Sequence, residues 1–96
     1  MKHYIIVKFK EGVEWRKLIP EIKELFSSVC DIDGVESAFH RPSISSLPNR
    51  FDYMIELVCR GQGLENFLAS DIHREWKARY GELFDKKAIF DCEEDE

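Results

Sequence analysis

Residues 3–9 read HYIIVKF, a stretch that is apolar on both of its alternating faces. Ile5 and Val7 fall on one face, whereas Tyr4 and Ile6 fall on the other. Alternation with a period of two, carried by β-branched and aromatic residues, predicts a β-strand. Because neither face is polar, we expect both sides of the sheet that holds this strand to be covered in the folded protein.

A helical pattern follows the first strand. Its apolar residues recur at the i, i+3, i+4 and i+7 spacing, with charged residues on the opposite side, which predicts an amphipathic helix. Pro20 falls inside this segment and removes one backbone donor, so we expect a kink or a loosely formed first turn there. The apolar stripe consists of Trp15, Leu18, Ile19, Ile22, Leu25, Phe26 and Val29.

The rest of the chain predicts three more strands and two short helices. Gly61 and Gly63 separate the third strand from the first of these helices. Ser70 or Asp71 can cap the second helix by accepting its free amides, and Gly81 is expected to end it. The strands are expected over residues 35–41, 51–60 and 86–92, and the helices over residues 64–68 and 72–80.

The order strand, helix, strand, strand, two helices, strand is that of a split βαβ unit. We therefore expect an α+β fold in which a four-stranded antiparallel sheet carries its helices on one face. The open face would expose apolar area worth several kcal/mol at about 25 cal/mol per Å². A second copy stacked face to face would bury that area and close a barrel, so the sequence predicts a homodimer through the open sheet face. That face is expected to contain Tyr4, Ile6, Met54, Val58 and either Ile89 or Phe90.

Composition and charge narrow the function. The chain has 96 residues, 44% of them hydrophobic, which fits one globular domain and excludes wholesale disorder. Its formal net charge is -5, and the last four residues, EEDE, carry most of it. We therefore expect a nearly neutral domain over residues 1–92 and an acidic C-terminal tail over residues 93–96. Without a basic stripe the domain offers no field for phosphate backbones, so nucleic acid is not expected as a partner.

Cysteine usage bears on the compartment. Cys30, Cys59 and Cys92 lie far apart without a C-x-x-C motif, and their odd number leaves at least one thiol unpaired. Such usage is typical of a reducing compartment. The apolar run at residues 4–7 is far shorter than a signal-peptide core or a membrane span. We expect a cytoplasmic protein that does not enter a membrane.

The sequence predicts neither a metal site nor a cofactor. The three histidines form no i, i+4 pair, and the cysteines do not cluster. No sequence feature specifies an axial ligand for haem. The segment Gly61-Gln62-Gly63 is too short for a phosphate-binding loop. His40 has no partner suggested by its spacing, and we interpret it as a surface residue.

Four short segments stand out in order along the chain. They are residues 2–12 (KHYIIVKFKEG), 51–57 (FDYMIEL), 73–76 (HREW) and 88–91 (AIFD). Together they resemble the stress-responsive A/B-barrel family, whose members are dimeric α/β-barrel proteins with a ferredoxin-like subunit. The resemblance covers nearly the whole chain and implies that fold, a dimer and a link to a stress response. It implies no single reaction, because this fold carries unrelated activities.

The resemblance also suggests a site. Plant polyketide cyclases of this family use a histidine base and a tyrosine in a cleft between sheet and helices. The base corresponds to His73 and a first-strand histidine to His3, but Phe67, which has no hydroxyl, stands at the tyrosine position. Further cleft histidines correspond to Tyr53 and Ser70, so the polar set is only partly present.

Three functions follow as hypotheses. The first is a protein that binds a small apolar or aromatic ligand in the cleft. The second is a cofactor-independent enzyme, cyclase-like or monooxygenase-like, with His73 as general base. The third is a structural or regulatory dimer without an active site, in which the histidine only packs in its helix. The residues expected to contact the ligand are His3, Ile5, Tyr53, Phe67 and Trp76.

Overall fold

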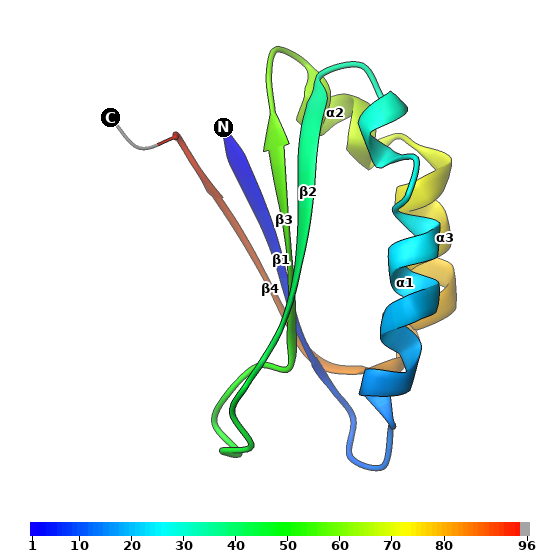
Figure 1. Ribbon diagram of the computed structural model, residues 1–96, viewed down its shortest axis with the longest axis vertical. Coiled ribbons are helices and arrows are strands. Elements are labelled where there is room, and N and C mark those ends of the chain that lie inside the picture. Colours follow the sequence, from blue (N-terminus) through cyan, green and yellow to red (C-terminus); the bar gives the residue numbers. More distant parts are fainter. Residues whose placement is uncertain (95–96) are drawn as a thin grey trace.

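Figure 1 shows the computed structural model of the chain, in which residues 1–94 are described. The strands form one antiparallel sheet in the order β2-β3-β1-β4, and the elements follow the predicted split βαβ order. The α+β, ferredoxin-like fold is therefore confirmed. The strands are β1 (Lys2–Phe9), β2 (Val35–Pro42), β3 (Tyr53–Cys59) and β4 (Phe84–Cys92), and the helices are α1 (Ile19–Leu25), α2 (Gly63–Leu68) and α3 (Asp71–Tyr80).

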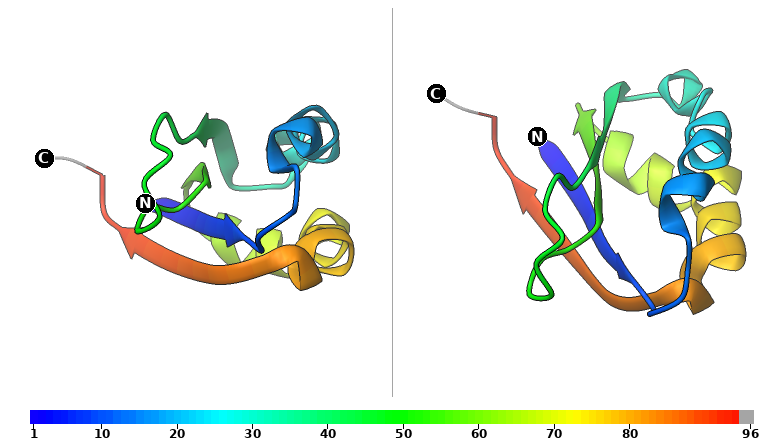
Figure 2. Two further views of the ribbon diagram at one scale, coloured as in Figure 1. Left: turned by 90° about the horizontal axis from the view of Figure 1, so that it is seen from below. Right: turned by 60° about the horizontal axis from the view of Figure 1, so that its bottom comes forward.

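The helices lie on one face of the sheet, as Figure 1 and both views of Figure 2 show. α1 and α3 run side by side over this face, and the Tyr80 hydroxyl on α3 donates to Glu21 Oε1 on α1 over 2.9 Å. Only Ala69 and Ser70 separate α2 from α3. No helix in residues 1–94 has the length and apolar character that crossing a membrane requires.

The first turn of the predicted long helix is a 3-10 helix over Trp15–Leu18, and regular α-helix begins at Ile19. Pro20 stands in the first turn of α1, where its missing amide costs no intrahelical hydrogen bond. The loosely formed first turn is therefore confirmed. Gly81 follows α3 as expected, but its φ of -55° is right-handed and a further 3-10 turn continues from it, so no left-handed stop is present.

β1 pairs with β3 on one side and with β4 on the other. Its odd-numbered residues face the helices, and Ile5 lies between Ile55 and Ile89 across the sheet. Its even-numbered residues face the open side, where Tyr4 lies opposite Phe90. Of the two candidates on β4, Phe90 therefore faces the open side and Ile89 faces the helices.

β2 departs from the simple alternation that the sequence suggests. The register shifts between Val35 and Ser37, so Val35 faces the helices while Phe39 faces the open side. A β-bulge inserts one extra residue and reverses the side on which later residues point. His40 consequently points toward the helices, and its interpretation as a surface residue is wrong.

The open face of the sheet is apolar apart from one ion pair, whose glutamate is buried and whose arginine is half exposed. Phe39 is 44% exposed and Phe90 is 59% exposed, which is high for aromatic side chains on a sheet. Glu56 is buried at the centre of this face, and its Oε1 accepts a hydrogen bond from Arg41 over 2.9 Å. Tyr4, Ile6, Met54 and Val58, all half-buried, complete the face as the sequence predicts.

Two glycines join the start of β2 to the start of α2. Gly34 has a φ of +89°, and a Cβ added to Gly63 would lie 2.1 Å from the Gly34 carbonyl oxygen. The Gly34 carbonyl also accepts from the Arg60 amide over 2.7 Å. Because neither position has room for a side chain, the backbone contact fixes where α2 begins.

Met1 lies near the end of β4, because β1 begins where β4 ends. The Met1 ammonium donates to the Cys59 carbonyl over 2.8 Å and lies 3.7 Å from the Glu94 carboxylate. Of the acidic tail expected over residues 93–96, Glu93 and Glu94 follow β4 without regular secondary structure. Asp95 and Glu96 lie outside the described residues.

Candidate functional site

A pocket of about 180 Å³ lies between the β1–β4 edge of the sheet and the helices α2 and α3. The sheet supplies its floor through the helix-facing residues of the two strands, and the helices supply its walls. We call it the His3/His73 pocket after its two imidazoles. Its lining consists of His3, Ile5, Leu64, Leu68, His73, Trp76, Lys87, Ile89 and Asp91.

His3 is held by a carboxylate from the neighbouring strand. Its Nδ1 lies 2.5 Å from Asp91 Oδ1, and the register places the two residues directly opposite each other. A carboxylate accepts hydrogen bonds, so Nδ1 carries a proton and Nε2 is the nitrogen left over. His3 is 3% exposed, and no buried side-chain nitrogen or oxygen in residues 1–94 lacks a partner. Nε2 of His3 therefore opens toward the pocket rather than being sealed in the core.

His73 is fixed by the beginning of α3. Ser70 caps this helix, and its Oγ accepts from the His73 amide over 3.2 Å. The imidazole Nδ1 of His73 lies 3.1 Å from the Leu68 carbonyl oxygen. Because a carbonyl only accepts, Nδ1 is the protonated nitrogen and Nε2 keeps its lone pair in the neutral ring. The ring is thus held in the tautomer that a general base needs.

Burial and charge favour the neutral form of His73. Desolvation lowers the pKa of His73 below its ordinary value, and the hydrogen bond from Nδ1 to Leu68 opposes this in part. The positive charges of Lys77 and Lys87, with a contribution from His3, lower the pKa further. A neutral imidazole near neutral pH is able to accept a proton.

Aromatic side chains separate and enclose the two imidazoles. Phe67 is fully buried, with its ring centroid 5.2 Å from that of His73 and 6.1 Å from that of His3. Trp76 is buried beside them and packs edge-on against Phe26 at 5.6 Å. The pocket therefore combines apolar walls with a few polar groups, which is the usual character of small-molecule sites.

Tyr53 lies elsewhere. Its hydroxyl is 2.5 Å from Nδ1 of His40, and Phe26, directly after α1, packs edge-on against the His40 ring at 5.6 Å. Burial raises the pKa of the Tyr53 phenol, and burial together with the nearby Lys23 lowers the pKa of His40. Both groups are therefore neutral, and the pair acts as a satisfied polar contact inside the core.

The structure brings most of the expected site residues together. His3, Ile5, Trp76 and His73 line the pocket, and Phe67 packs directly behind the imidazoles. Tyr53 is not among the lining residues, and its hydroxyl pairs with His40 instead. Sequence reasoning missed Leu64, Leu68, Lys87, Ile89 and Asp91. Asp91 carries the most chemistry of these, and only the β1–β4 register, which puts it opposite His3, reveals it.

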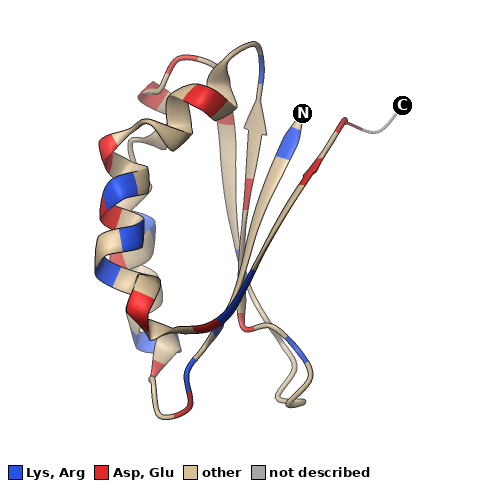
Figure 3. Cartoon of the chain, turned by 180° about the vertical axis from the view of Figure 1, so that it is seen from behind, with Lys and Arg blue, Asp and Glu red and all other residues tan. Residues whose placement is uncertain are grey.

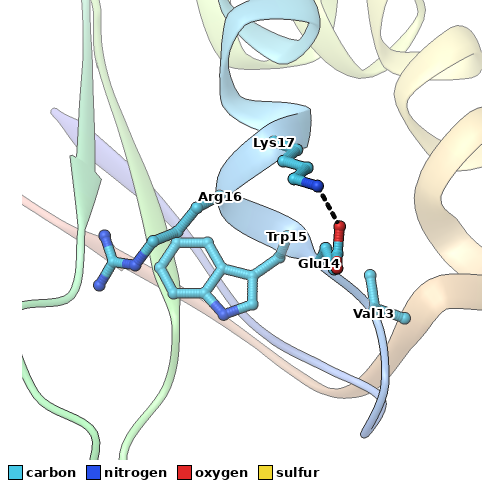
Figure 4. A pocket seen from close by; sticks show the side chains of 5 residues that line it. All are labelled: Val13, Glu14, Trp15, Arg16 and Lys17. Carbon is cyan, nitrogen blue, oxygen red and sulfur yellow. Dashed lines mark ion pairs between the residues drawn. The ribbon is translucent and has the colours of Figure 1, made fainter.

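A second hollow, of about 310 Å³, lies over the segment before α1 (Figure 4). The Arg16 guanidinium stacks over the Trp15 indole at 4.4 Å, and Lys17 pairs with Glu14 beside it. Trp15 in turn stacks on Phe9, with nearly parallel rings 6.1 Å apart. All of its lining residues come from one short exposed stretch, 13–17, so this hollow is a surface feature of the turn.

Within residues 1–94, no group of three or more His, Cys, Asp or Glu side chains could hold a metal ion. Four side chains bring polar groups to the His3/His73 pocket. These are two imidazoles with free Nε2 positions, one carboxylate and one ammonium. Such a set can orient a small polar group and move a proton.

Comparisons with known proteins rest on solved structures. No family model matches this sequence, and no curated protein matches it either. A dimeric protein of unknown function with a ferredoxin-like fold from Bacteroides fragilis is similar with a TM-score of 0.79 at 13% identity, covering 96% of this chain and 93% of that one. A DABB-family protein with a ferredoxin-like fold from Mesorhizobium loti has a TM-score of 0.70 at 13% identity, with 93% and 90% covered.

A third similar structure is the hydroxynitrile lyase from Passiflora edulis, with a TM-score of 0.72 at 14% identity, covering 93% of this chain and 87% of that one. At these identities the likeness extends to the fold and not to the residues of a site. It covers nearly the full length of every chain compared. This chain thus has the ferredoxin-like fold of these similar structures.

Proposed function

We propose that this chain binds a small ligand with one apolar or aromatic ring in the His3/His73 pocket. The observation that carries the proposal is the convergence of two oriented imidazoles on one cavity walled by Trp76 and Leu68. A dry cavity of about 150 Å³ is known to hold a single benzene ring. The pocket, at about 180 Å³, has room for one such ring and a small polar group.

A thermal-shift screen of monocyclic compounds tests this proposal. A ligand at a hundredfold excess over its Kd stabilises the folded chain by about 2.7 kcal/mol, which raises Tm by about 10 °C or more for a domain of this size. Leu68→Trp fills the pocket from its rim and should abolish the shift. Ala78→Trp, on the exposed side of α3, is the control and should leave it intact. If no ring compound stabilises the wild-type chain, the proposal fails.

A cofactor-independent enzyme is the second candidate. It is favoured by His73, because burial stabilises the neutral form of its ring. The Nδ1 proton is bonded to the Leu68 carbonyl, which leaves the Nε2 lone pair free to accept a proton. One of the similar structures is a hydroxynitrile lyase, so a lyase activity is compatible with this fold. Once a turned-over compound is known, His73→Ala should lower kcat by about 100-fold or more, the usual contribution of a general base. Unchanged turnover would remove His73 as the general base.

We further propose that two copies associate through the open sheet face. Phe39 and Phe90 on that face are the support, together with the dimeric state named for the similar structure from Bacteroides fragilis. Dimerisation without a functional site is the third hypothesis, and it gains weight only if the ligand screen fails. A cytoplasmic location and a link to stress remain part of the proposal, supported by free Cys30, Cys59 and Cys92 and by the family resemblance.

A further inference from the structure

Positive charge gathers at the mouth of the His3/His73 pocket. Lys87 lines the pocket and also lines a neighbouring hollow of about 290 Å³, with which the pocket shares Trp76. Lys77 on α3 and Lys86 on β4 line the same hollow. This gathering is notable because the chain as a whole carries a formal charge of -5. Figure 3 shows the basic segments on α3 and at the beginning of β4, and acidic segments toward the end of β4.

Those lysines are not engaged by the acids nearby. Among the ion pairs of residues 1–94, none involves Lys77, Lys86 or Lys87. Two carboxylates belong to the same region. Asp91 is bonded to His3, and Asp85 lines the hollow without an ion pair among those residues. The ammonium groups therefore remain available to an incoming anion.

Lys87 is the lysine best placed to meet a ligand. It lies opposite Val7 on the helix-facing side of the sheet, one pleat from Ile89 and two from Asp91. Lys87 and His73 line the same pocket, and the charges of Lys87 and Lys77 both lower the pKa of His73. An ammonium at the edge of an apolar cavity attracts an anionic group more strongly than one in open water, because the local dielectric is lower.

We infer that the ligand is an anion, a single ring carrying a carboxylate or similar group, whose ring lies against Trp76 and whose charge is met by Lys87. This inference rests on the proposed binding function and specifies its ligand class. The ring fills the His3/His73 pocket, and the anionic group reaches the side that opens onto the neighbouring hollow. Neutral rings of the same shape bind the same pocket with lower affinity.

Matched pairs of compounds test the inference. Benzoate, phenylacetate and 3-phenylpropionate are titrated into the full chain beside benzamide, phenylacetamide and 3-phenylpropionamide, with binding followed by amide chemical shifts. The amides keep the ring and the length and remove the charge. We expect the best carboxylate to bind about five- to tenfold more tightly than its amide, the range for a partly exposed, charge-assisted contact. Raising the salt concentration should shrink that ratio, because exposed charges are screened.

Two variants locate the charge. Lys87→Met keeps the aliphatic stem and removes the ammonium, and it should bring the carboxylate down to the affinity of its amide. Lys23→Met, on the exposed side of α1 and outside the pocket, is the matched control and should leave the ratio unchanged. Thermal unfolding of both variants verifies that each is folded.

The possible outcomes distinguish failure of the anionic-ligand inference from failure of the proposed binding function. Equal affinity of carboxylates and amides overturns the anionic ligand and leaves the binding function standing. A carboxylate preference that survives Lys87→Met overturns the role of that lysine. Binding of neither series by the wild-type chain removes the proposed function itself. A preference that Lys87→Met abolishes and Lys23→Met preserves supports the inference.

Discussion

His3 and Asp91 lie 88 residues apart in the chain and directly opposite each other on β1 and β4, with 2.5 Å between Nδ1 and Oδ1. The contact joins the central strand to an edge strand at the floor of the pocket. It leaves the second nitrogen of the imidazole for a ligand. The geometry of the whole pocket therefore depends on how firmly β4 is held in register.

Asp91→Asn should lower the free energy of unfolding by about 1 kcal/mol at neutral pH. The charge-assisted hydrogen bond to His3 becomes a neutral one, and the half-exposed position of the carboxylate limits the loss. Urea denaturation measures the change. Asp85→Asn, on the same strand and without an ion pair in residues 1–94, is the control and should change stability little. An equal loss in both variants would contradict the stated role of the contact.

Histidine ring signals should respond selectively to two lysine substitutions. Burial lowers the pKa of His73, and the charge of Lys87 lowers it further. Burial also lowers the pKa of His40, to which Lys23 adds its charge. Lys87→Met should therefore raise the pKa of His73 alone, and Lys23→Met should raise that of His40 alone. Titration of the ring protons by NMR measures both pKa values. A change in the pKa of His40 in Lys87→Met, or of His73 in Lys23→Met, would contradict these pairings.

Stability should fall in acid, in part through His40. Because burial holds its folded-state pKa below the unfolded value of about 6.5, the unfolded chain binds the proton first. The contribution of His40 is fully present above that pH and is lost as the pH falls below it. His40→Asn should show a smaller decrease in urea midpoint than wild type between about pH 7.5 and pH 5.5. If the urea midpoints of the variant and the wild type fall equally over this pH range, His40 does not contribute to the acid sensitivity.

Tyr53→Phe should cost about 1–3 kcal/mol of unfolding free energy, because the half-buried Nδ1 of His40 loses its partner. Tyr80→Phe removes a hydroxyl that bonds to Glu21, whose exposed carboxylate water can satisfy, so its cost should be smaller. Chemical denaturation of the two variants gives the comparison. The reverse order of costs would argue against the buried pair.

Gly63→Ala should destabilise the fold by at least about 2 kcal/mol, because the new methyl group collides with backbone atoms of Gly34 that cannot move aside. Gly81→Ala is its control. Gly81 has a right-handed φ and no atom within 4 Å of an added Cβ, so alanine there should be neutral or slightly stabilising. Thermal melts of both variants test the contrast.

Phe90→Asp should weaken the proposed dimer, because it places a charge on the open sheet face beside Tyr4. Ala78→Asp puts the same charge on the exposed side of α3 and should leave association unchanged. Light scattering over a range of micromolar concentrations measures the mass. A wild-type chain that remains a monomer throughout would refute the dimer.

Much of the fold was accessible from the sequence because the apolar periodicities of residues 3–9 and 15–29 are strong. The doubtful first turn at Pro20 was also predictable, since one missing amide has a local effect. The side of the sheet on which His40 lies was not predictable, because it depends on a bulge in β2 that adds one residue to the pairing. No local pattern marks that extra residue.

The candidate site was only half predictable for a related reason. His3, Ile5, His73 and Trp76 belong to elements that the sequence identifies, and they do line one pocket. Asp91 enters through the pairing of the first and last strands, and pairing register is a long-range property of the sheet. Tyr53 was assigned to the cleft through the family resemblance, but its hydroxyl pairs with His40 on β2 and it does not line the pocket.

β4 supplies Lys87, Ile89 and Asp91 to the pocket, but it is hydrogen-bonded to one neighbour only. An edge strand can detach in a local opening that costs less than unfolding the whole domain. Each such opening would disrupt the His3/His73 pocket while β1, β3 and the helices keep their structure. A bound ligand would therefore slow amide hydrogen exchange in β4 at lower occupancy than it slows exchange in the core. The rate at which β4 detaches would then limit how long the ligand stays bound.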